Sequence, residues 1–367
     1  MKFSIEREVL LRPLQEVIGA VERKQTLPIL GNVLIEASDS GLLLTASDSE
    51  IEVQSETEIS VDSPGATTVP ARKLLDICRS LKDNSRMDIE LSGEQVKVKS
   101  GRTRFSLATM PAGEFPKINQ LQDAQTVELK QSVLAQAIKA TSFSMAQQDV
   151  RFYLNGMLVE INQGRLCCVA TDGHRLAYSE CETDVEPEEP IRAILPRKSV
   201  NELTRLIGSA GEETLEISIT KNHLQVALHE TIMTTKLIDG RFPDYNRVIP
   251  IDVNKELLLN KESLRATLQR AAILSSEKYR GVRLAVEQGV LTVSSNNPDR
   301  EEAIDELEID YAGEGAEIGF NVTYLLDVLG AMDGENARIL LKDSNSSALV
   351  MPEAEDNTKY VIMPMRL

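Results

Sequence analysis

The sequence predicts an α+β fold made of three tandem copies of one domain, each with antiparallel strands and two helices. Two observations support this prediction. The 367-residue chain repeats one order of helix-like and strand-like segments at intervals near 125 residues, and its strand-like runs alternate β-branched with polar residues. A period this long exceeds any solenoid unit, so each copy should have its own core. We expect the domains at 1–125, 126–252 and 253–367, with the helices on one face of the sheets.

Each copy opens with an amphipathic helix. The three segments are EVLLRPLQEVIGA, QSVLAQAIKATSF and ESLRATLQRAAIL, and they predict helices over 7–20, 130–142 and 261–274. Each contains two apolar residues four positions apart, which share one helical face. These pairs are Leu10 and Leu14, Leu134 and Ile138, and Leu264 and Leu268.

Strands follow each of these helices. ILGNVLIEA, YLNGMLVEI and YRGVRLAVE each contain a glycine, and Gly31, Gly156 and Gly281 are spaced by 125 residues. The next strand in each copy ends in a polar turn: GLLLTASDSE, GRLCCVATDGH and GVLTVSSNNPD. Later runs such as VKVKSGRTRFSLATM and LQVALHETIMTTKLI alternate in the way that predicts antiparallel strands.

A second helix follows in each copy, in TTVPARKLLDICRSL, AILPRKSVNELTRLI and IGFNVTYLLDVLGAM. Pro70, Pro196 and Asn321 occupy equivalent places, and we expect helices over 72–83, 197–207 and 321–332. On the first of these helices one face is apolar and the other cationic. The apolar face holds Leu74, Leu75, Ile77, Cys78 and Leu81, and the opposite face holds Arg72, Arg79 and Lys82.

The net charge of −17 counts against ordinary nucleic-acid binding, which depends on Lys and Arg neutralising phosphates. The charge is unevenly distributed, however. The six expected helices carry 14 Lys and Arg but only 7 Asp and Glu, so they sum to +7 and the remainder to −24. Three domains with cationic helices on one side predict a curved body that holds DNA by enclosing it, with little contact to bases.

Several functional classes lack their sequence signals. No apolar run approaches the ~18 residues of a membrane span, and the charged N-terminus MKFSIEREVLLRPL predicts a protein that stays in the cytoplasm. The four cysteines show no CxxC spacing, and Cys167 and Cys168 are expected to be buried. No GxxxxGK[ST] loop, HExxH pair or Cys–His metal spacing occurs, so we expect no metal and no cofactor.

The segment CCVATDGHRLAYSE (167–180) admits a catalytic interpretation. His174 with Asp172 would be a base and its orienting carboxylate, and Cys168 or Ser179 a nucleophile. Against this, no glycine-flanked nucleophile motif is present. The chain is therefore not expected to be an enzyme. A scaffold that docks peptides without holding DNA is the other alternative.

Longer motifs make one resemblance specific. They are TLPILGN (26–32), SMAQQDVRFYLNGML (144–158), ATDGHRLA (170–177), DGRFPDY (239–245), IGFNVTYLLDVL (318–329) and YVIMPMRL (360–367). With the triplication, they resemble the bacterial sliding clamp family, the beta subunits of the replicative DNA polymerase III holoenzyme, from Met1 to Leu367. The resemblance implies a head-to-tail homodimeric ring of six clamp domains, with sheets outside and helices lining the hole. Such a processivity factor encircles duplex DNA without sequence specificity, slides along it and tethers the polymerase.

The resemblance also implies a hydrophobic pocket between domains 2 and 3 for short segments of glutamine and hydrophobic residues. These occur in polymerases, the clamp loader and repair proteins. Met363 and Met365 suit such a pocket because their side chains adapt to several partners. Asn345 departs from the family pattern, which is often apolar there. The pocket residues implied are Leu154, Thr171, Gly173, His174, Arg175, Leu176, Pro243, Arg247, Val248, Tyr279, Asn321, Tyr324, Ser347, Val361, Ile362, Met363, Pro364, Met365 and Arg366.

Two further surfaces are implied by the resemblance. The residues expected to face DNA are Lys24, Arg72, Lys73, Gln148, Phe152, Tyr153, Arg197 and Lys198. At the subunit seam, Phe105 is expected opposite Ile273 and Leu274, with Arg102 and Arg104 facing Glu301 and Glu302. The alternative for Ile273 and Leu274 is a place in the core of their own domain.

Overall fold

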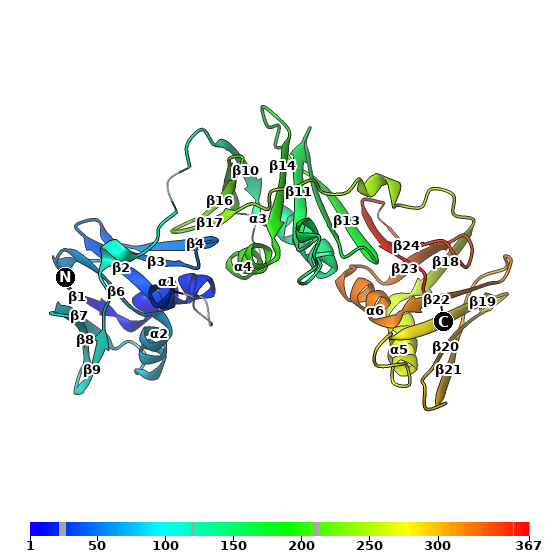
Figure 1. The fold of residues 1–367 in the computed structure, drawn as a ribbon, viewed down its shortest axis with the longest axis horizontal. Coiled ribbons are helices and arrows are strands. Elements are labelled where there is room, and N and C mark those ends of the chain that lie inside the picture. The colour runs from blue at the N-terminus through cyan, green and yellow to red at the C-terminus, as the bar shows by residue number, and fades with distance from the viewer. Residues whose placement is uncertain (22–26, 119–120, 209–210, 212, 355, 367) are drawn as a thin grey trace. The chain divides into compact units, whose positions relative to one another are not determined.

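The computed structural model describes residues 1–21, 27–118, 121–208, 211, 213–354 and 356–366. Every copy has the same order of elements: a strand, a helix, four strands, a helix and three strands, with one short strand added in the first copy. The repeat predicted from the sequence is therefore a repeat of structure (Figure 1). No helix in these residues is both long and apolar enough to cross a membrane.

The elements of the three copies are as follows. The first copy comprises β1 (Lys2–Glu6), α1 (Arg7–Val17), β2 (Asn32–Ser38), β3 (Gly41–Ser47), β4 (Ile51–Thr57), β5 (Val61–Ser63), β6 (Gly65–Pro70), α2 (Ala71–Ser80), β7 (Arg86–Ser92), β8 (Gln95–Ser100) and β9 (Thr103–Ala108). The second comprises β10 (Gln125–Lys130), α3 (Gln131–Thr141), β11 (Gly156–Asn162), β12 (Arg165–Thr171), β13 (Arg175–Glu182), β14 (Ile191–Pro196), α4 (Arg197–Ile207), β15 (Thr214–Ile219), β16 (His223–Leu228) and β17 (Thr231–Lys236). The third comprises β18 (Lys255–Asn260), α5 (Lys261–Ala272), β19 (Gly281–Glu287), β20 (Val290–Asn296), β21 (Glu302–Glu308), β22 (Ala316–Asn321), α6 (Val322–Ala331), β23 (Asn336–Leu341), β24 (Ala348–Pro352) and β25 (Thr358–Ile362).

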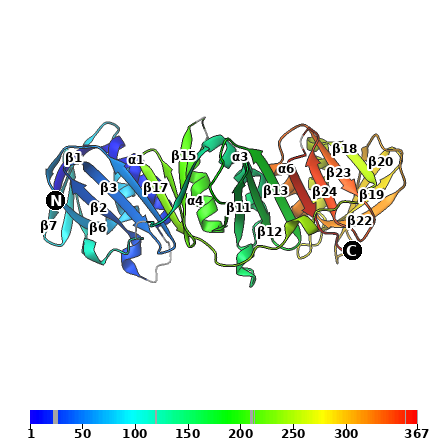
Figure 2. The same ribbon diagram turned by 90° about the horizontal axis from the view of Figure 1, so that it is seen from above.

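Two compact units make up the chain, and neither coincides with a copy. The first unit contains residues 1–132 and 201–237. Its strands form a sheet in the order β5-β1-β7-β8-β9 and an eight-stranded sheet in the order β10-β15-β16-β17-β4-β3-β2-β6. The larger sheet joins the first copy to the second through the antiparallel pair β4–β17. Helix α1 packs on β3 and β4 and against α2. Figure 2 shows β2 and β3 side by side in the larger sheet.

The second unit contains residues 133–200 and 238–367. Its strands form an eight-stranded sheet in the order β14-β11-β12-β13-β25-β24-β23-β18 and a four-stranded sheet in the order β21-β20-β19-β22. Here the second copy joins the third through the antiparallel pair β13–β25. Helices α5 and α6 pack together, α5 on β20 and β21, and α6 on β22 and β25.

The predicted helix faces are confirmed. All six residues of the i, i+4 apolar pairs are at most 2% exposed. On α2, Leu74, Leu75, Ile77 and Cys78 are buried, whereas Arg72 and Arg79 are exposed. Leu81 and Lys82, predicted on the same helix, lie after its end, where Leu81 is half-buried and Lys82 exposed. The hairpins β8–β9 and β16–β17 are antiparallel, as expected. All four cysteines are buried, and none forms a disulfide.

The equivalent residues Pro70, Pro196 and Asn321 each end a strand immediately before the second helix of their copy. Pro70 has a φ of −56°, close to the value its ring enforces at such a junction. In the third copy the Asn321 side chain instead accepts a hydrogen bond from the Thr323 backbone N at 2.9 Å. The helix ends differ slightly from prediction: α2 stops at Ser80 and α5 at Ala272.

Candidate functional site

The turn between β12 and β13 carries the TDGHRL motif and is fixed by its own side chains. The Asp172 carboxylate accepts hydrogen bonds from the backbone N of His174 (2.9 Å) and of Arg175 (3.0 Å). Thr171 accepts one from the Gly173 N and donates one to the Arg175 carbonyl. Gly173 has a φ of +88°, a conformation that favours glycine. The turn therefore presents an exposed His174 from a rigid backbone.

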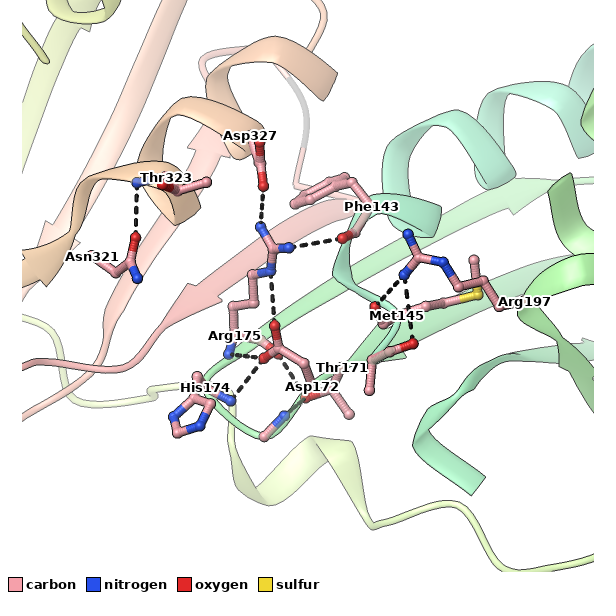
Figure 3. Close-up of polar contacts among 12 residues, drawn as sticks. Phe143, Met145, Thr171, Asp172, His174, Arg175, Arg197, Asn321, Thr323 and Asp327 are labelled. Atoms are coloured by element: carbon pink, nitrogen blue, oxygen red, sulfur yellow. Dashed lines mark hydrogen bonds and ion pairs between the residues drawn. The ribbon is translucent and has the colours of Figure 1, made fainter. Parts of the chain in front are cut away.

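Arg175 is the centre of a contact network in the second unit (Figure 3). Its guanidinium contacts Asp172 at 3.1 Å, Asp327 of α6 at 2.5 Å and the Phe143 carbonyl at 2.9 Å. It also lies over the Tyr324 ring, 4.5 Å from the centroid. The Arg175 side chain is only 11% exposed. Its contacts indicate that it anchors the turn to α6, and little of it is open to a partner.

The geometry disfavours the catalytic interpretation of this segment. Asp172 bonds to backbone N–H groups and to Arg175, whereas the His174 ring points away from this network (Figure 3). Cys168 and Ser179 are at most 1% exposed. Burial also raises the pKa of the Cys168 thiol well above its usual value, which opposes the thiolate that a nucleophile requires.

The C-terminal strand brings the last residues of the chain beside this turn. In the β13–β25 pair, Leu176 lies opposite Val361. Beyond the strand, the Met363 N donates to the His174 carbonyl at 2.9 Å, and the Met365 N to the Gly319 carbonyl at 2.8 Å. The final residues are thus held by backbone hydrogen bonds to the second and the third copy.

The pocket candidates divide between two faces of the eight-stranded sheet, because successive strand residues point to opposite sides. Leu176, Val361 and the partly buried Val248 share one apolar cluster. Ile362 and Tyr324 belong to the core cluster on the other side. Leu154 is buried at 1% exposure.

The remaining pocket candidates lie closer to the surface. Asn321 caps α6 and donates to the Tyr279 carbonyl at 3.5 Å. Asn345 is exposed in the turn between β23 and β24. The exposed candidates are Gly173, His174, Pro243, Arg247, Tyr279, Met363 and Arg366, and the half-buried ones are Ser347, Pro364 and Met365.

The candidates for facing DNA differ in how free their side chains are. Lys24 lies outside the described residues. Arg72 and Lys73 are exposed on α2, and Arg72 donates to the Val21 carbonyl at 3.3 Å. Arg197 is half-buried and donates to the Met145 carbonyl at 2.7 Å, so its guanidinium is partly engaged within the fold. Lys198 is half-buried as well.

The loop after α3 carries the other candidates for facing DNA. Gln148 is exposed with a φ of +55°. Phe152 is 57% exposed, and the Tyr153 ring meets it edge-on at 5.9 Å. Arg151, which no sequence motif singled out, ties this loop to the TDGHRL turn. Its guanidinium bonds Asp149 at 2.8 Å and donates to the Asp172 carbonyl at 3.3 Å.

The seam candidates lie at strands on the edges of sheets. β9 ends the five-stranded sheet of the first unit, with Arg102 and Arg104 exposed. β21 ends the four-stranded sheet of the second unit, with Glu301 and Glu302 exposed. Ile273 is 77% exposed, so the alternative of a core position is wrong for this residue. Ile304 on β21, which sequence analysis missed, is 60% exposed. Phe105 and Leu274 are half-buried.

Comparison with known proteins gives one family along the chain. Family models match the N-terminal domain of the DNA polymerase III beta subunit at 1–119, its central domain at 128–244 and its C-terminal domain at 246–366. The beta sliding clamps of Pseudomonas putida KT2440 and Escherichia coli K12 are each 47% identical, over 100% of both chains.

Solved structures agree with these sequence matches. A DNA polymerase sliding clamp from Pseudomonas aeruginosa superimposes with a TM-score of 0.96 at 46% identity. The DNA polymerase sliding clamp from Caulobacter crescentus superimposes with a TM-score of 0.93 at 38% identity. Both alignments cover 100% of each chain.

Proposed function

The chain belongs to the DNA polymerase III beta subunit family, the sliding clamps, and on that premise we propose how its residues serve the ring, the DNA and the partners. Members of this family are processivity factors of DNA replication rather than enzymes. The observation that carries the proposal is the full-length match across three domains whose helices together carry a net positive charge in an otherwise acidic chain. An acidic ring retains a polyanion by closing around it.

Two chains meet head to tail, with β9 of one protomer beside β21 of its partner. Each strand has one free edge, and pairing them removes both edges. The charges are complementary, because Arg102 precedes β9 and Arg104 lies in it, whereas Glu301 precedes β21 and Glu302 begins it. The exposed Ile273 becomes buried against Phe105. A heterologous contact of this kind closes when the rotation per subunit is half a turn.

DNA passes the exposed cations of α2 and the loop that carries Gln148 and Phe152. Lys73, Arg79 and Lys82 are exposed, and no ion pair holds them among the residues described. Arg72 and Lys198 add positive charge. Arg197 donates to the Met145 carbonyl, so it attracts DNA through its charge rather than by contacting a phosphate. Lys24 and Tyr153 complete the proposed set.

Partner segments bind where Leu176, Val248 and Val361 share an apolar cluster beside exposed His174 and Met363. A segment of glutamine and hydrophobic residues buries its apolar side chains there. Affinity near micromolar, about −8 kcal/mol, permits exchange among the polymerase, the clamp loader and repair proteins. We propose that the other pocket residues named in the sequence analysis line the same site.

Domain boundaries at 1–125, 126–252 and 253–367 are part of the same proposal, supported by the family-model matches at 1–119, 128–244 and 246–366. We also assign the protein to the cytoplasm, where a bacterial replicative polymerase acts.

Retention on circular DNA tests the proposal. Loaded onto nicked circular plasmid, the protein should stay bound through a wash at high salt and leave once the plasmid is linearised. Proteins that hold phosphates directly lose affinity steeply with salt instead. Equal loss from circular and linear DNA would contradict the ring, and peptide binding without retention would favour the scaffold alternative.

A further inference from the structure

The segment that connects the second copy to the third, residues 239–253, has no strand pairing. It carries three of the proposed pocket residues: Pro243, Arg247 and Val248. Within it, the Val248 N donates to the Tyr245 carbonyl at 3.0 Å, and Arg247 pairs with Asp244 at 3.0 Å. Neither contact reaches the sheet, so something else must hold this wall of the pocket in place.

Side chains of this segment attach it to the sheet in two ways. Phe242, Val248, Ile249 and Val253 pack in or against the apolar cluster, and Tyr245 adds a hydrogen bond. Phe242 is buried in the apolar cluster at 2% exposure. This packing holds the segment close to the sheet but does not fix its orientation, because it involves no hydrogen bond. The Tyr245 hydroxyl donates to Glu160 of β11 at 2.8 Å. In the described part of the chain, Tyr245 is the one residue of 239–253 whose side chain hydrogen-bonds the sheet.

The acceptor of this bond is itself oriented. Arg192 of β14 pairs with the other oxygen of Glu160 at 3.1 Å, and the Glu160 side chain is 21% exposed. A hydrogen bond to an ionised acceptor is about twice as strong as one between neutral groups. The Tyr245 ring also packs against the Tyr178 ring, with centroids 5.7 Å apart. Tyr245 is therefore held at both its ring and its hydroxyl.

We propose that Tyr245 and Glu160 are positioning residues for partner binding, and that their hydrogen bond sets the place of Val248 and Arg247 in the pocket. This inference rests on the proposed partner site. Val248 is three residues from Tyr245 and bonded to its carbonyl, so release of the Tyr245 hydroxyl shifts Val248 directly. Partner segments then meet a displaced apolar wall.

Tyr178 offers a matched control. Its hydroxyl donates to Glu180 at 2.8 Å, and its ring packs in the same cluster, but it lies on β13 rather than on the connecting segment. Tyr178→Phe and Tyr245→Phe thus make the same chemical change in the same apolar cluster. Each removes one hydrogen bond from a tyrosine hydroxyl to a carboxylate. Only Tyr245→Phe releases the pocket wall.

The experiment measures binding of a synthetic peptide, one glutamine followed by leucine and phenylalanine residues, to the full-length protein by calorimetry. Tyr245→Phe should weaken peptide binding by about three- to tenfold, because part of the free energy of one charge-assisted hydrogen bond is lost from the binding site. Tyr178→Phe should change it less than twofold. In the Val248→Ala background, Tyr245→Phe should add little further loss, because both changes act on the same wall.

Amide exchange supplies a second measurement. The Val248 amide should exchange faster in Tyr245→Phe and at the wild-type rate in Tyr178→Phe. Equal affinity losses in the two variants, no loss in either, or additive losses with Val248→Ala would overturn the positioning role while leaving the partner site intact. A wild-type protein that fails to bind the peptide would overturn the partner site itself and this inference with it.

Discussion

Neighbouring copies are connected at two joints, each an antiparallel strand pair between two copies, and the two joints are built alike. The β4–β17 pair joins the first copy to the second, and the β13–β25 pair joins the second to the third, each through five facing residue pairs. Beside each pair an arginine of the second copy reaches a helix of the neighbouring copy: Arg205 reaches the carbonyls of Gln15 and Glu16, and Arg175 reaches Asp327. The two joints differ in what surrounds these arginines.

The β4–β17 joint is polar. Glu16 accepts hydrogen bonds from Ser55 at 2.6 Å and from Thr231 at 2.7 Å, so one carboxylate links both strands to α1. Arg205 pairs with Glu202, whose side chain is 8% exposed. The polar groups of this joint satisfy one another.

The β13–β25 joint is aromatic. Arg175 lies over Phe143 and Tyr324, and Phe143 packs against Tyr360 at 5.9 Å. On the other face of the sheet, Leu176 and Val361 belong to an apolar cluster, and the exposed His174 and Met363 lie two residues away from them along the chain. The proposed partner site lies at the joint whose strands carry this apolar cluster. At both joints the sheet of one copy continues into the next, so this feature does not distinguish them.

The largest effect is expected from removing the last five residues, MPMRL. This truncation deletes Met363, whose backbone bonds the His174 carbonyl, together with the segment held at Gly319. Peptide binding should fall at least a hundredfold, below detection by calorimetry. The dimer, measured by sedimentation, should persist because β9 and β21 are untouched. Unchanged affinity would remove the distinction between the joints.

Arg175→Ala should cost more stability than Arg205→Ala. Each substitution leaves a largely buried carboxylate without its arginine, Asp172 at 17% exposure and Glu202 at 8%, and removing one partner of a buried ion pair costs about 3–5 kcal/mol. Arg175→Ala also removes the contacts of the guanidinium with the Phe143 and Tyr324 rings, which adds to its cost. Urea unfolding measures both variants, and equal costs would show that the aromatic surroundings add nothing.

Gly19→Ala probes the packing of the polar joint. A Cβ at Gly19 would overlap the Glu202 carboxylate. We expect a loss of about 1–3 kcal/mol, the range for overpacking. Gly330→Ala on α6 is the control, since a Cβ there meets nothing within 4 Å. It should stabilise the protein by about 0.5–1 kcal/mol in thermal or urea unfolding.

The smallest effect concerns acid stability at the loop beside the partner site. The hydrogen bonds from Arg151 lower the pKa of Asp149 to about 2. A lowered folded-state pKa adds stability above the unfolded value, near 4, and that stability is lost as pH falls toward 2. Asp149→Asn should therefore flatten the pH dependence of unfolding in this window. An unchanged slope would show that the Arg151 contact is not maintained in solution.

The repeat, the buried helix faces and the cationic surface of α2 could be predicted because they depend on local periodicity. Leu74 and Cys78 lie four residues apart, so they share a face in any α-helix. The equivalent places of Pro70, Pro196 and Asn321 were likewise visible as spacing, and each proves to end a strand before a helix. The family resemblance followed from motifs long enough to be specific.

Sequence spacing did not predict the roles of Arg175, Arg151 and Tyr245. For Arg175 and Tyr245 the partners lie far along the chain: Asp327 is 152 residues from Arg175, and Glu160 is 85 residues from Tyr245. Arg151 joins a near neighbour, Asp149, to the Asp172 carbonyl 21 residues on. One signal was available for Asp327, the single charge in the otherwise apolar and neutral helix VTYLLDVLGA. Nothing in the spacing of residues indicated which arginine it would meet.

The sequence by itself determined which residues form helices and strands, which faces they bury, and that the pattern occurs three times. Tertiary structure alone decided that sheets continue from copy to copy and that Arg175 is an anchor. It also decided that Ile273 is exposed at 77%. The physical reason is that periodicity specifies the face of an element, whereas the partner of that face is set by contacts between residues distant in sequence.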